Sequence, residues 1–326
     1  MARRTLIQAI NEALRQEMRR DDRIVLLGED VGRVGGVFRA TEGLQQEFGP
    51  DRVIDTPLAE SAIIGAALGM AVYGLIPVPE IQFDGFLPPA FDHIISHVAR
   101  IRNRSRGRFT APMVIRVPHG GGIRALEHHS EAPETFYTHI PGIKVVIPAT
   151  AYDAKGLLIS AIRDPDPVIF FEPKRIYRAF REEVPEEPYT VPLGKARVAR
   201  EGNDVTLIAW GAMVHVALAA AEKAAAEHGW SCEVLDLRTL SPLDIDAIIA
   251  SVQKTGRCVV VHEAPRQSGF GGEIAALIGE RALLYLEAPV VRVTGFDTAM
   301  PYFTLEDYYL PSPERVLKGI AQVMNF

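Results

Sequence analysis

Short apolar runs of strand length alternate with segments of helical periodicity along most of this chain. Leu6, Ile10, Leu14 and Met18 recur at four-residue steps, which predicts a first helix, and the apolar run 24–27 predicts the strand that follows. We expect further strands near 53 and at 77–81, 113–117, 143–147 and 168–171, with helices after 57 and at 89–102 and 151–162. Short buried strands separated by helices are typical of a parallel sheet covered on both faces, so the sequence predicts an α/β fold.

A stretch rich in Glu and Pro, residues 181–202, separates this part from a second alternation. We interpret it as a linker, because clustered Pro and Gly interrupt regular structure. Beyond it, strands are expected at 205–210, 232–237, 258–261 and 290–293, and helices at 214–227, 244–251 and 273–283. The sequence therefore predicts two domains, residues 1–187 and a smaller α/β domain at residues 188–326.

Composition and charge exclude several classes of protein. The net charge of −6 and the dispersed Lys and Arg residues predict no nucleic-acid partner. Cys232 and Cys258 form neither a C-x-x-C pair nor a metal quartet, which favours a reducing cytoplasm over a disulfide or zinc framework. The basic N-terminus lacks a sustained apolar stretch, so we expect no secretory signal. The uncharged run 61–79 is long enough for a membrane span, but its glycines and prolines predict a buried helix followed by a buried strand.

One carboxylate, Glu60, lies in an otherwise apolar strand-turn-helix segment. Val53 ends the predicted strand, Thr56 fits an N-cap and Pro57 fits the first helical position, which puts Glu60 in the opening turn. Glu60 could simply complement the positive end of the helix dipole. Alternatively, its apolar neighbours raise its pKa, so that it holds or passes a proton at neutral pH.

Further polar and aromatic residues follow predicted strands. Glu29 adds a second carboxylate just after the strand 24–27, and Gln82 and Phe86 follow the strand 77–81, where they could line a pocket. His129 belongs to an adjacent histidine pair behind a three-glycine loop, which suits acid/base work better than a two-ligand metal site, although a structural role is the alternative. The glycine-rich segment 269–275 lacks the last small residue of a dinucleotide-binding motif.

Seven segments together resemble the β subunits of thiamine-diphosphate-dependent 2-oxoacid dehydrogenases, in order and through nearly the whole chain. They are Gly28-Glu-Asp-Val31, Thr56-Pro-Leu-Ala-Glu60, Glu80-Ile-Gln-Phe83, His128-His-Ser130, Tyr152-Asp-Ala-Lys-Gly-Leu157, Phe171-Glu-Pro-Lys174 and Leu235-Asp-Leu-Arg-Thr239. The resemblance implies an N-terminal pyrimidine-binding domain and a C-terminal transketolase-type domain.

The resemblance also implies roles for the residues singled out above. Glu60 would hydrogen-bond N1′ of the aminopyrimidine and promote the imino tautomer, which takes the C2 proton of the thiazolium. Phe86 would stack near the pyrimidine, and Leu58 and Gln82 would line that half of the cofactor. His129 would support acyl transfer to a lipoyl group. Glu29 would belong to the cofactor surroundings or to a proton path.

Metal sites follow from the resemblance as well. The Gly-Asp-Gly motif that holds magnesium and the diphosphate in such enzymes is missing from the sequence, which implies that an α subunit supplies it in an α2β2 assembly. A potassium site is implied at the end of the helix 151–162, partly through backbone carbonyls. Its residues would be Met113, Ala161, Ile162, Asp164 and Asp166, although Asp166 stands where relatives often have Asn.

The substrate and the class of activity stay open at this level. Segments 171–177 and 295–301 look more like branched-chain enzymes, whereas 157–164 and 323–326 look like bacterial pyruvate enzymes, with a slight preference for branched-chain acids. The expected reaction is oxidative decarboxylation with acyl transfer to the lipoyl group of an acyltransferase core. An acetoin-cleaving or transketolase-like subunit and a noncatalytic scaffold subunit are the alternatives.

Overall fold

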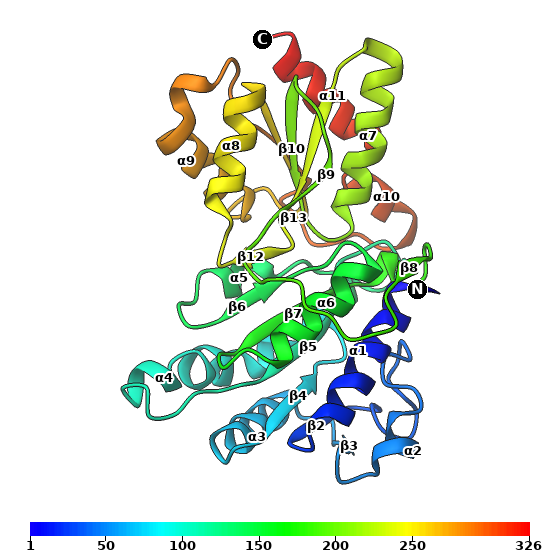
Figure 1. Cartoon of the computed structure of the whole chain (residues 1–326). Coiled ribbons are helices and arrows are strands. Elements are labelled where there is room, and N and C mark those ends of the chain that lie inside the picture. Colours follow the sequence, from blue (N-terminus) through cyan, green and yellow to red (C-terminus); the bar gives the residue numbers. More distant parts are fainter. The chain divides into compact units, whose positions relative to one another are not determined.

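The computed structural model describes all 326 residues, which form two compact units (Figure 1). The N-terminal unit comprises Met1–His119 and Phe136–Leu193, and the C-terminal unit comprises Gly120–Thr135 and Gly194–Phe326. The predicted boundary after residue 187 lies a few residues before this division, and no sequence pattern predicts that residues 120–135 group with the second unit. Both units are α/β, as the sequence predicts.

A parallel sheet forms the centre of the N-terminal unit. Its strands lie in the order β6-β7-β5-β4-β2-β3, and every neighbouring pair is parallel. Their bounds are β2 (Ile24–Gly28), β3 (Val53–Asp55), β4 (Ile76–Glu80), β5 (Val114–His119), β6 (Lys144–Val146) and β7 (Val168–Pro173). Strands β2, β4, β5 and β7 are buried along their whole length, which explains why they read as continuous apolar runs.

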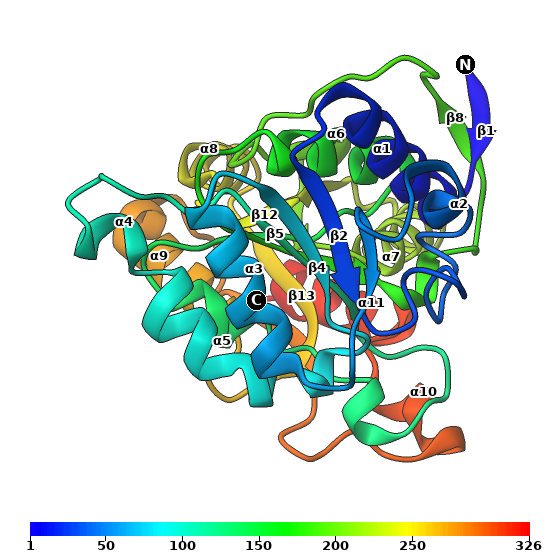
Figure 2. The same ribbon diagram turned by 90° about the horizontal axis from the view of Figure 1, so that it is seen from below.

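Helices cover both faces of this sheet (Figure 2). Helix α1 (Leu6–Arg20) packs on α6 (Ala151–Ile162) on one face, and α3 (Glu60–Val72) lies on the other with the helical segment 88–104. Thr5 caps α1 in a capping box with Gln8. The remaining helical segments before the linker are α2 (Leu44–Phe48), the 3-10 turns Asp84–Phe86 and Pro88–Ala90, the π-helix His93–Val98, α4 (Ile101–Arg104), α5 (Glu134–Thr138) and Lys174–Ile176.

Three predictions about these elements were wrong in detail. Helix α3 begins at Glu60 rather than at Pro57, with Ala59 as its N-cap and no side-chain cap, so Thr56 is not a cap. The predicted helix 89–102 is broken into short turns around a π-helix. The stretch 181–202 is more than a linker, because β8 (Glu182–Val184) pairs antiparallel with β1 (Ala2–Arg4), a contact that no local pattern announces.

The C-terminal unit has its own sheet, in the order β14-β13-β10-β11-β9, in which only β9 is antiparallel. Its strands are β9 (Arg197–Arg200), β10 (Val205–Ala209), β11 (Cys232–Asp236), β13 (Cys258–Pro265) and β14 (Val291–Gly295). The short β12 (Thr239–Ser241) falls within the residues of this unit but is not a strand of this sheet. The helices are α7 (Met213–His228), α8 (Ile245–Thr255), α9 (Gly271–Ala282), α10 (Glu306–Tyr309) and α11 (Pro313–Met324), with 3-10 turns at Glu127–His129, Leu283–Tyr285 and Phe303–Leu305.

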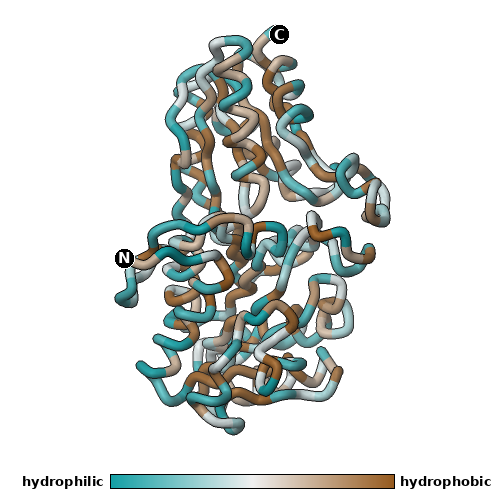
Figure 3. Tube along the Cα trace, turned by 90° about the vertical axis from the view of Figure 1, so that its right-hand side faces the viewer, coloured by the Kyte–Doolittle hydropathy of each residue, from teal (hydrophilic) through white to brown (hydrophobic).

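Apolar residues concentrate along the strands inside each unit (Figure 3). The uncharged run 61–79 divides between α3 and β4, as predicted. No helix combines the length and the apolar character that crossing a membrane requires. Both cysteines are buried and free, and burial raises the pKa of Cys232 to about 11.

Candidate active site

The candidate site lies at one edge of the N-terminal sheet, where the carboxyl ends of β2, β3 and β4 meet. Gly28, the last residue of β2, is level with Asp55 of β3 and with Glu80 of β4. The Thr56 N–H donates to the Gly28 carbonyl at 2.9 Å, which holds the two strand exits together. Ligands of open parallel sheets bind at this edge, so the topology brings the residues after each strand to the position where chemistry is expected.

Glu29 and Glu60 form a pair of interacting carboxylates at this edge. They are nearly buried, with 8% and 6% of their surfaces exposed. Burial raises the pKa of Glu29, and the negative charges of Glu60 and Asp30 raise it further. The Glu29 Oε1 atom is buried and makes no hydrogen bond, so it can accept one from a ligand. Glu29 can therefore hold a proton at a higher pH than an isolated carboxyl could.

Glu60 opens helix α3 at the end of an extended link. The link runs from β3 through Thr56, Pro57 and Leu58, and the Thr56 hydroxyl is buried with no hydrogen-bond partner. Leu58 is 75% exposed, which is unusual for a leucine and leaves an apolar side chain available at the edge of the site. Leu58 therefore lies in the extended link two residues before Glu60, outside the helix.

Gln82 and Phe86 follow β4 and are half-buried. The Gln82 amide donates to Asp30 Oδ2 at 3.3 Å, which links the exits of β4 and β2. Phe86 packs edge-to-face against Phe83 with ring centroids 5.8 Å apart. The side chains of Gln82 and Phe86 are thus held in the segment that follows β4 by Asp30 and Phe83 respectively.

A buried ion pair, which the sequence analysis missed, holds the turn that carries Phe86. Asp84 and Lys174 are both buried, and Lys174 Nζ lies 2.7 Å from Asp84 Oδ2. Lys174 also donates to the Pro118 carbonyl at 3.3 Å. No local pattern marks Asp84 and Lys174 as partners, because they are 90 residues apart and only the fold brings them together.

A second network, of buried ion pairs, connects the neighbouring strands β4, β5 and β7. Arg116 donates to both oxygens of Glu172 at 2.7 and 3.0 Å and to Glu80 Oε2 at 2.7 Å, and the Tyr177 hydroxyl donates to Glu172 at 2.6 Å. Burial raises the pKa of Glu80, although the Arg116 charge opposes that effect. Glu80 is the last residue of β4, so this network fixes the strand end from which Gln82 emerges.

His129 lies in the C-terminal unit, in the 3-10 turn Glu127–His129, while the other site residues lie in the N-terminal unit. Its loop is anchored within its own unit, because the Gly121 N–H donates to Glu263 at 2.9 Å and the Gly122 N–H donates to Glu306. The rings of His128 and His129 are 4.7 Å apart. The structure thus brings Glu29, Leu58, Glu60, Gln82 and Phe86 to one edge and assigns His129 to the other unit.

The residues of the implied potassium site are engaged with protein groups. Lys144 Nζ lies 2.6 Å from Asp164, and Arg102 Nε lies 2.6 Å from Asp166. The Met113 carbonyl accepts from the Val168 N–H at 3.0 Å, and the Ala161 carbonyl accepts from the Asp164 N–H at 3.2 Å. No group of three or more His, Cys, Asp or Glu side chains has a geometry suited to a metal ion. A cation here would therefore have to bind mainly through backbone carbonyls, and the site stays a prediction.

Comparisons with known proteins agree with this architecture. Residues 3–179 match the family described as "Transketolase, pyrimidine binding domain", and residues 194–316 match "Transketolase, C-terminal domain". The chain is 56% identical over the full length of both chains to the "Pyruvate dehydrogenase E1 component subunit beta" of Bacillus subtilis. It is 55% identical to the protein of the same name from Acholeplasma laidlawii, over 99% of this chain and 98% of the other.

Among solved structures, the fold is similar to that of a "Split gene transketolase, inactive beta4 tetramer". The TM-score is 0.81, the identity is 24%, and 98% of each chain is covered. This likeness supports the fold alone.

Proposed function

This chain belongs to the transketolase-like family of pyruvate dehydrogenase E1 β subunits, and from that premise we propose that it is the β subunit of a thiamine-diphosphate-dependent pyruvate dehydrogenase. In this proposal it works with an α subunit in an α2β2 assembly in the cytoplasm, decarboxylates pyruvate and passes the acetyl group to a lipoyl group of an acyltransferase core. The observation that carries the proposal is the Glu29–Glu60 pair at the strand-end edge, in a chain similar to these subunits over its full length.

The residues at this edge fit the aminopyrimidine half of thiamine diphosphate. A heteroaromatic ring with a nitrogen to be hydrogen-bonded needs a carboxyl group, an apolar contact and a flat aromatic neighbour. Glu60, the exposed Leu58 and Phe86 offer these, and the unpartnered Glu29 Oε1 offers a further acceptor. When bound, the cofactor would supply the nucleophilic carbon and the electron sink for decarboxylation.

In this proposal the roles of the chain's own residues follow from their surroundings. Glu60 hydrogen-bonds pyrimidine N1′, and Glu29 holds a proton nearby because burial and the Glu60 charge raise its pKa. Leu58, Gln82 and Phe86 orient the ring. His129 supports transfer of the acyl group to the lipoyl group. The diphosphate and its magnesium ion would be held by the α subunit. A potassium ion would bind at the predicted site, which consists of Met113, Ala161, Ile162, Asp164 and Asp166.

Pyruvate is proposed over the branched-chain acids that the sequence analysis slightly preferred. The local segments at 171–177 and 295–301 favoured the branched-chain reading, but relatives that are 52–56% identical over the whole chain carry the pyruvate name. Similarity over the whole chain is stronger evidence for the substrate than similarity of two short segments. Neither segment contains a residue of the candidate active site.

The test is 2-oxoacid-dependent reduction of a lipoyl domain by the chain co-expressed with its α subunit, with thiamine diphosphate and magnesium. We expect pyruvate to be preferred to 3-methyl-2-oxobutanoate, and Glu60→Gln to lower kcat by about 10²- to 10⁴-fold. Glu187→Gln is the matched control, because it removes the same charge from an exposed side chain. In Glu60→Gln, NMR titration should also show the Glu29 pKa moving down toward its ordinary value, since a neighbouring negative charge is lost.

Each other outcome contradicts a defined part of the proposal. Full activity of Glu60→Gln would refute the role of Glu60, and preference for 3-methyl-2-oxobutanoate would make the chain a branched-chain enzyme subunit. Decarboxylation without lipoyl reduction would indicate an acetoin-cleaving or transketolase-like enzyme. An intact, cofactor-loaded assembly without decarboxylation would indicate a scaffold subunit.

A further inference from the structure

A groove of about 610 Å³ opens in the N-terminal unit beside the first two turns of α1. None of the candidate-site residues Glu29, Leu58, Glu60, Gln82 and Phe86 lines this groove. Its walls come from β1 and α1, the loop before α2, and the segment that follows β7. The lining residues are Arg4, Thr5, Ile7, Gln8, Asn11, Glu12, Arg15, Arg39, Glu42, Arg178 and Arg181.

The groove is strongly cationic in a chain that is acidic overall. Five arginines face two glutamates, a formal charge of +3 among the lining residues, whereas the whole chain carries −6. Guanidinium groups gathered at one concave surface repel one another, and this repulsion persists unless an anion or a carboxylate offsets it. Positive charge is therefore concentrated in this groove, although the chain as a whole is acidic.

Three of these arginines pair with no carboxylate. Arg178 donates to the Phe38 carbonyl at 2.6 Å, Arg181 donates to the Gln8 amide oxygen at 2.9 Å, and Arg39 donates to the Val34 carbonyl. Each of these bonds uses one nitrogen of a group that carries five N–H donors. The neutral acceptors hold the three guanidiniums in place and leave their positive charges available.

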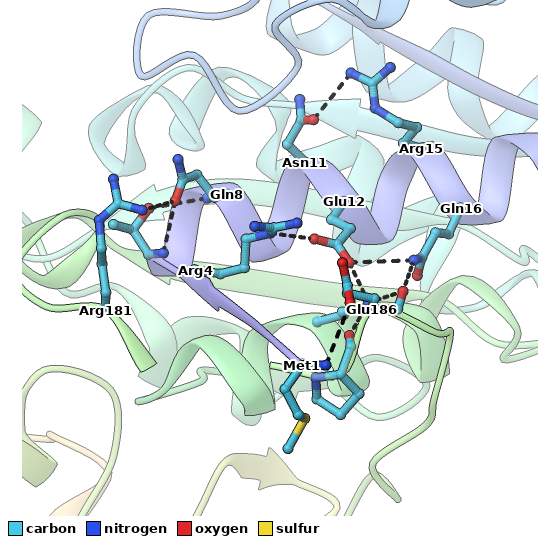
Figure 4. Close-up of polar contacts among 12 residues, drawn as sticks. Met1, Arg4, Gln8, Asn11, Glu12, Arg15, Gln16, Arg181 and Glu186 are labelled. Atoms are coloured by element: carbon cyan, nitrogen blue, oxygen red, sulfur yellow. Dashed lines mark hydrogen bonds and ion pairs between the residues drawn. The ribbon is translucent and has the colours of Figure 1, made fainter. Parts of the chain in front are cut away.

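The other two arginines already form ion pairs. Arg4 lies 2.6 Å from Glu12, and Arg15 pairs with Glu47, which lies outside the groove. Figure 4 shows Arg4 beside Glu12, Arg15 beside Asn11 and Arg181 beside Gln8. The lining residues that form no ion pair are Arg39, Arg178, Arg181 and Glu42, so three positive charges and one negative charge leave a formal charge of +2 for a ligand.

We propose that this groove binds a small phosphorylated molecule through Arg39, Arg178 and Arg181. A phosphoryl group offers several charged acceptor oxygens, and the planar guanidinium fork matches them with paired hydrogen bonds. The Gln8 amide, whose oxygen accepts from Arg181, has its nitrogen available as a polar donor for the rest of the molecule. The volume of the groove falls in the range of small-molecule sites, about 300–1,000 Å³. Protein partners typically bind over larger and flatter surfaces.

The experiment is isothermal titration calorimetry with inorganic pyrophosphate and with ADP, at fixed ionic strength and without magnesium. It uses the full chain, alone and assembled with its α subunit. Arg178→Gln and Arg181→Gln remove one charge each and keep an amide donor. Arg106→Gln is the matched control, because Arg106 is also exposed and pairs with no carboxylate but lies outside the groove.

We expect both probes to bind the assembly and each groove variant to raise Kd about tenfold or more, as for loss of a charged hydrogen bond. The control should change Kd less than twofold, and acetate at the same ionic strength should not compete. Far-UV circular dichroism of each variant checks that it is folded. ADP binding more tightly than pyrophosphate would show that the groove also recognises the organic part of the ligand.

Three results would overturn the proposal. The first is an equal loss in Arg106→Gln, which would mean only unspecific attraction. The second is binding to the isolated chain that disappears in the assembly, which would make the groove a subunit contact. The third is the absence of binding by folded wild-type protein. None of these results bears on lipoyl reduction, so the proposed enzymatic function is tested separately.

Discussion

Replacing Arg116 by Met should destabilise the N-terminal unit far more than replacing an exposed arginine in an ion pair of the same length. Arg116 is 1% exposed and bonds Glu80 and Glu172, which are 4% and 0% exposed. The substitution leaves two buried carboxylates without their cation. Removing one member of a buried ion pair typically costs about 3–5 kcal/mol of unfolding free energy, because the remaining charge stays desolvated.

The matched control is Arg23→Met. Arg23 Nη2 lies 2.7 Å from Asp21, the same distance as Arg116 Nη1 from Glu80, but the Arg23 side chain is 62% exposed. Exposed pairs are worth about 0–1 kcal/mol because water screens them. The comparison therefore isolates burial from hydrogen-bond length.

The assay is urea unfolding followed by far-UV circular dichroism, repeated between pH 5 and pH 8. Tryptophan fluorescence follows the C-terminal unit separately, because Trp210 and Trp230 both lie there. Loss of Arg116 should raise the pKa of Glu80 further, since the charge that opposes the effect of burial is removed. The native state then binds more protons than the unfolded state above the ordinary glutamate pKa. Its stability should fall as the pH rises, so the deficit of Arg116→Met should be larger at pH 8 than at pH 5.

The proposed role of the buried ion pairs is refuted if Arg116→Met loses no more unfolding free energy than Arg23→Met. It is also refuted if the loss in Arg116→Met does not depend on pH. A rescue variant sharpens the test. Adding Glu80→Gln and Glu172→Gln to Arg116→Met removes both uncompensated charges and keeps an acceptor for Tyr177. Recovery of most of the lost stability is expected, because buried ion pairs are often replaceable by neutral groups.

Two further predictions concern other buried titratable side chains. Lys155 Nζ is buried and donates to Glu12 at 2.8 Å and to the carbonyls of Pro185 and Glu186 at 2.6 and 3.0 Å. Lys155→Met should therefore lower the free energy of unfolding by about 3 kcal/mol and speed limited proteolysis after Val184. An unchanged rate of cleavage would contradict this role of Lys155. Burial lowers the pKa of His262 to about 4, so the native state binds fewer protons than the unfolded state between pH 6.5 and pH 4. Stability of the C-terminal unit, measured by tryptophan fluorescence, should fall by about 3 kcal/mol as the pH drops through that range, and His262→Gln should remove this slope.

The sequence determined the elements whose patterns are local. Helix α6 has the bounds 151–162 that the sequence predicts, and the continuous apolar runs became the buried parallel strands. The same logic put Glu29, Gln82 and Phe86 after strand ends, and the topology then brought them to one edge. Helix α11 was missed although Ser312 followed by Pro313 marks its start, so its local signal was available.

Only the tertiary structure decided which distant residues meet. The pairing of β1 with β8, the grouping of residues 120–135 with the C-terminal unit and the ion pairs of Arg116 each join segments far apart in sequence. Periodicity reports which face of an element is buried, but it carries no information about the partner of a buried charge. The charge surplus in the groove beside α1 was equally invisible in a chain whose net charge is negative. Side chains from separate segments make up both features, and folding alone brings them within reach of one another.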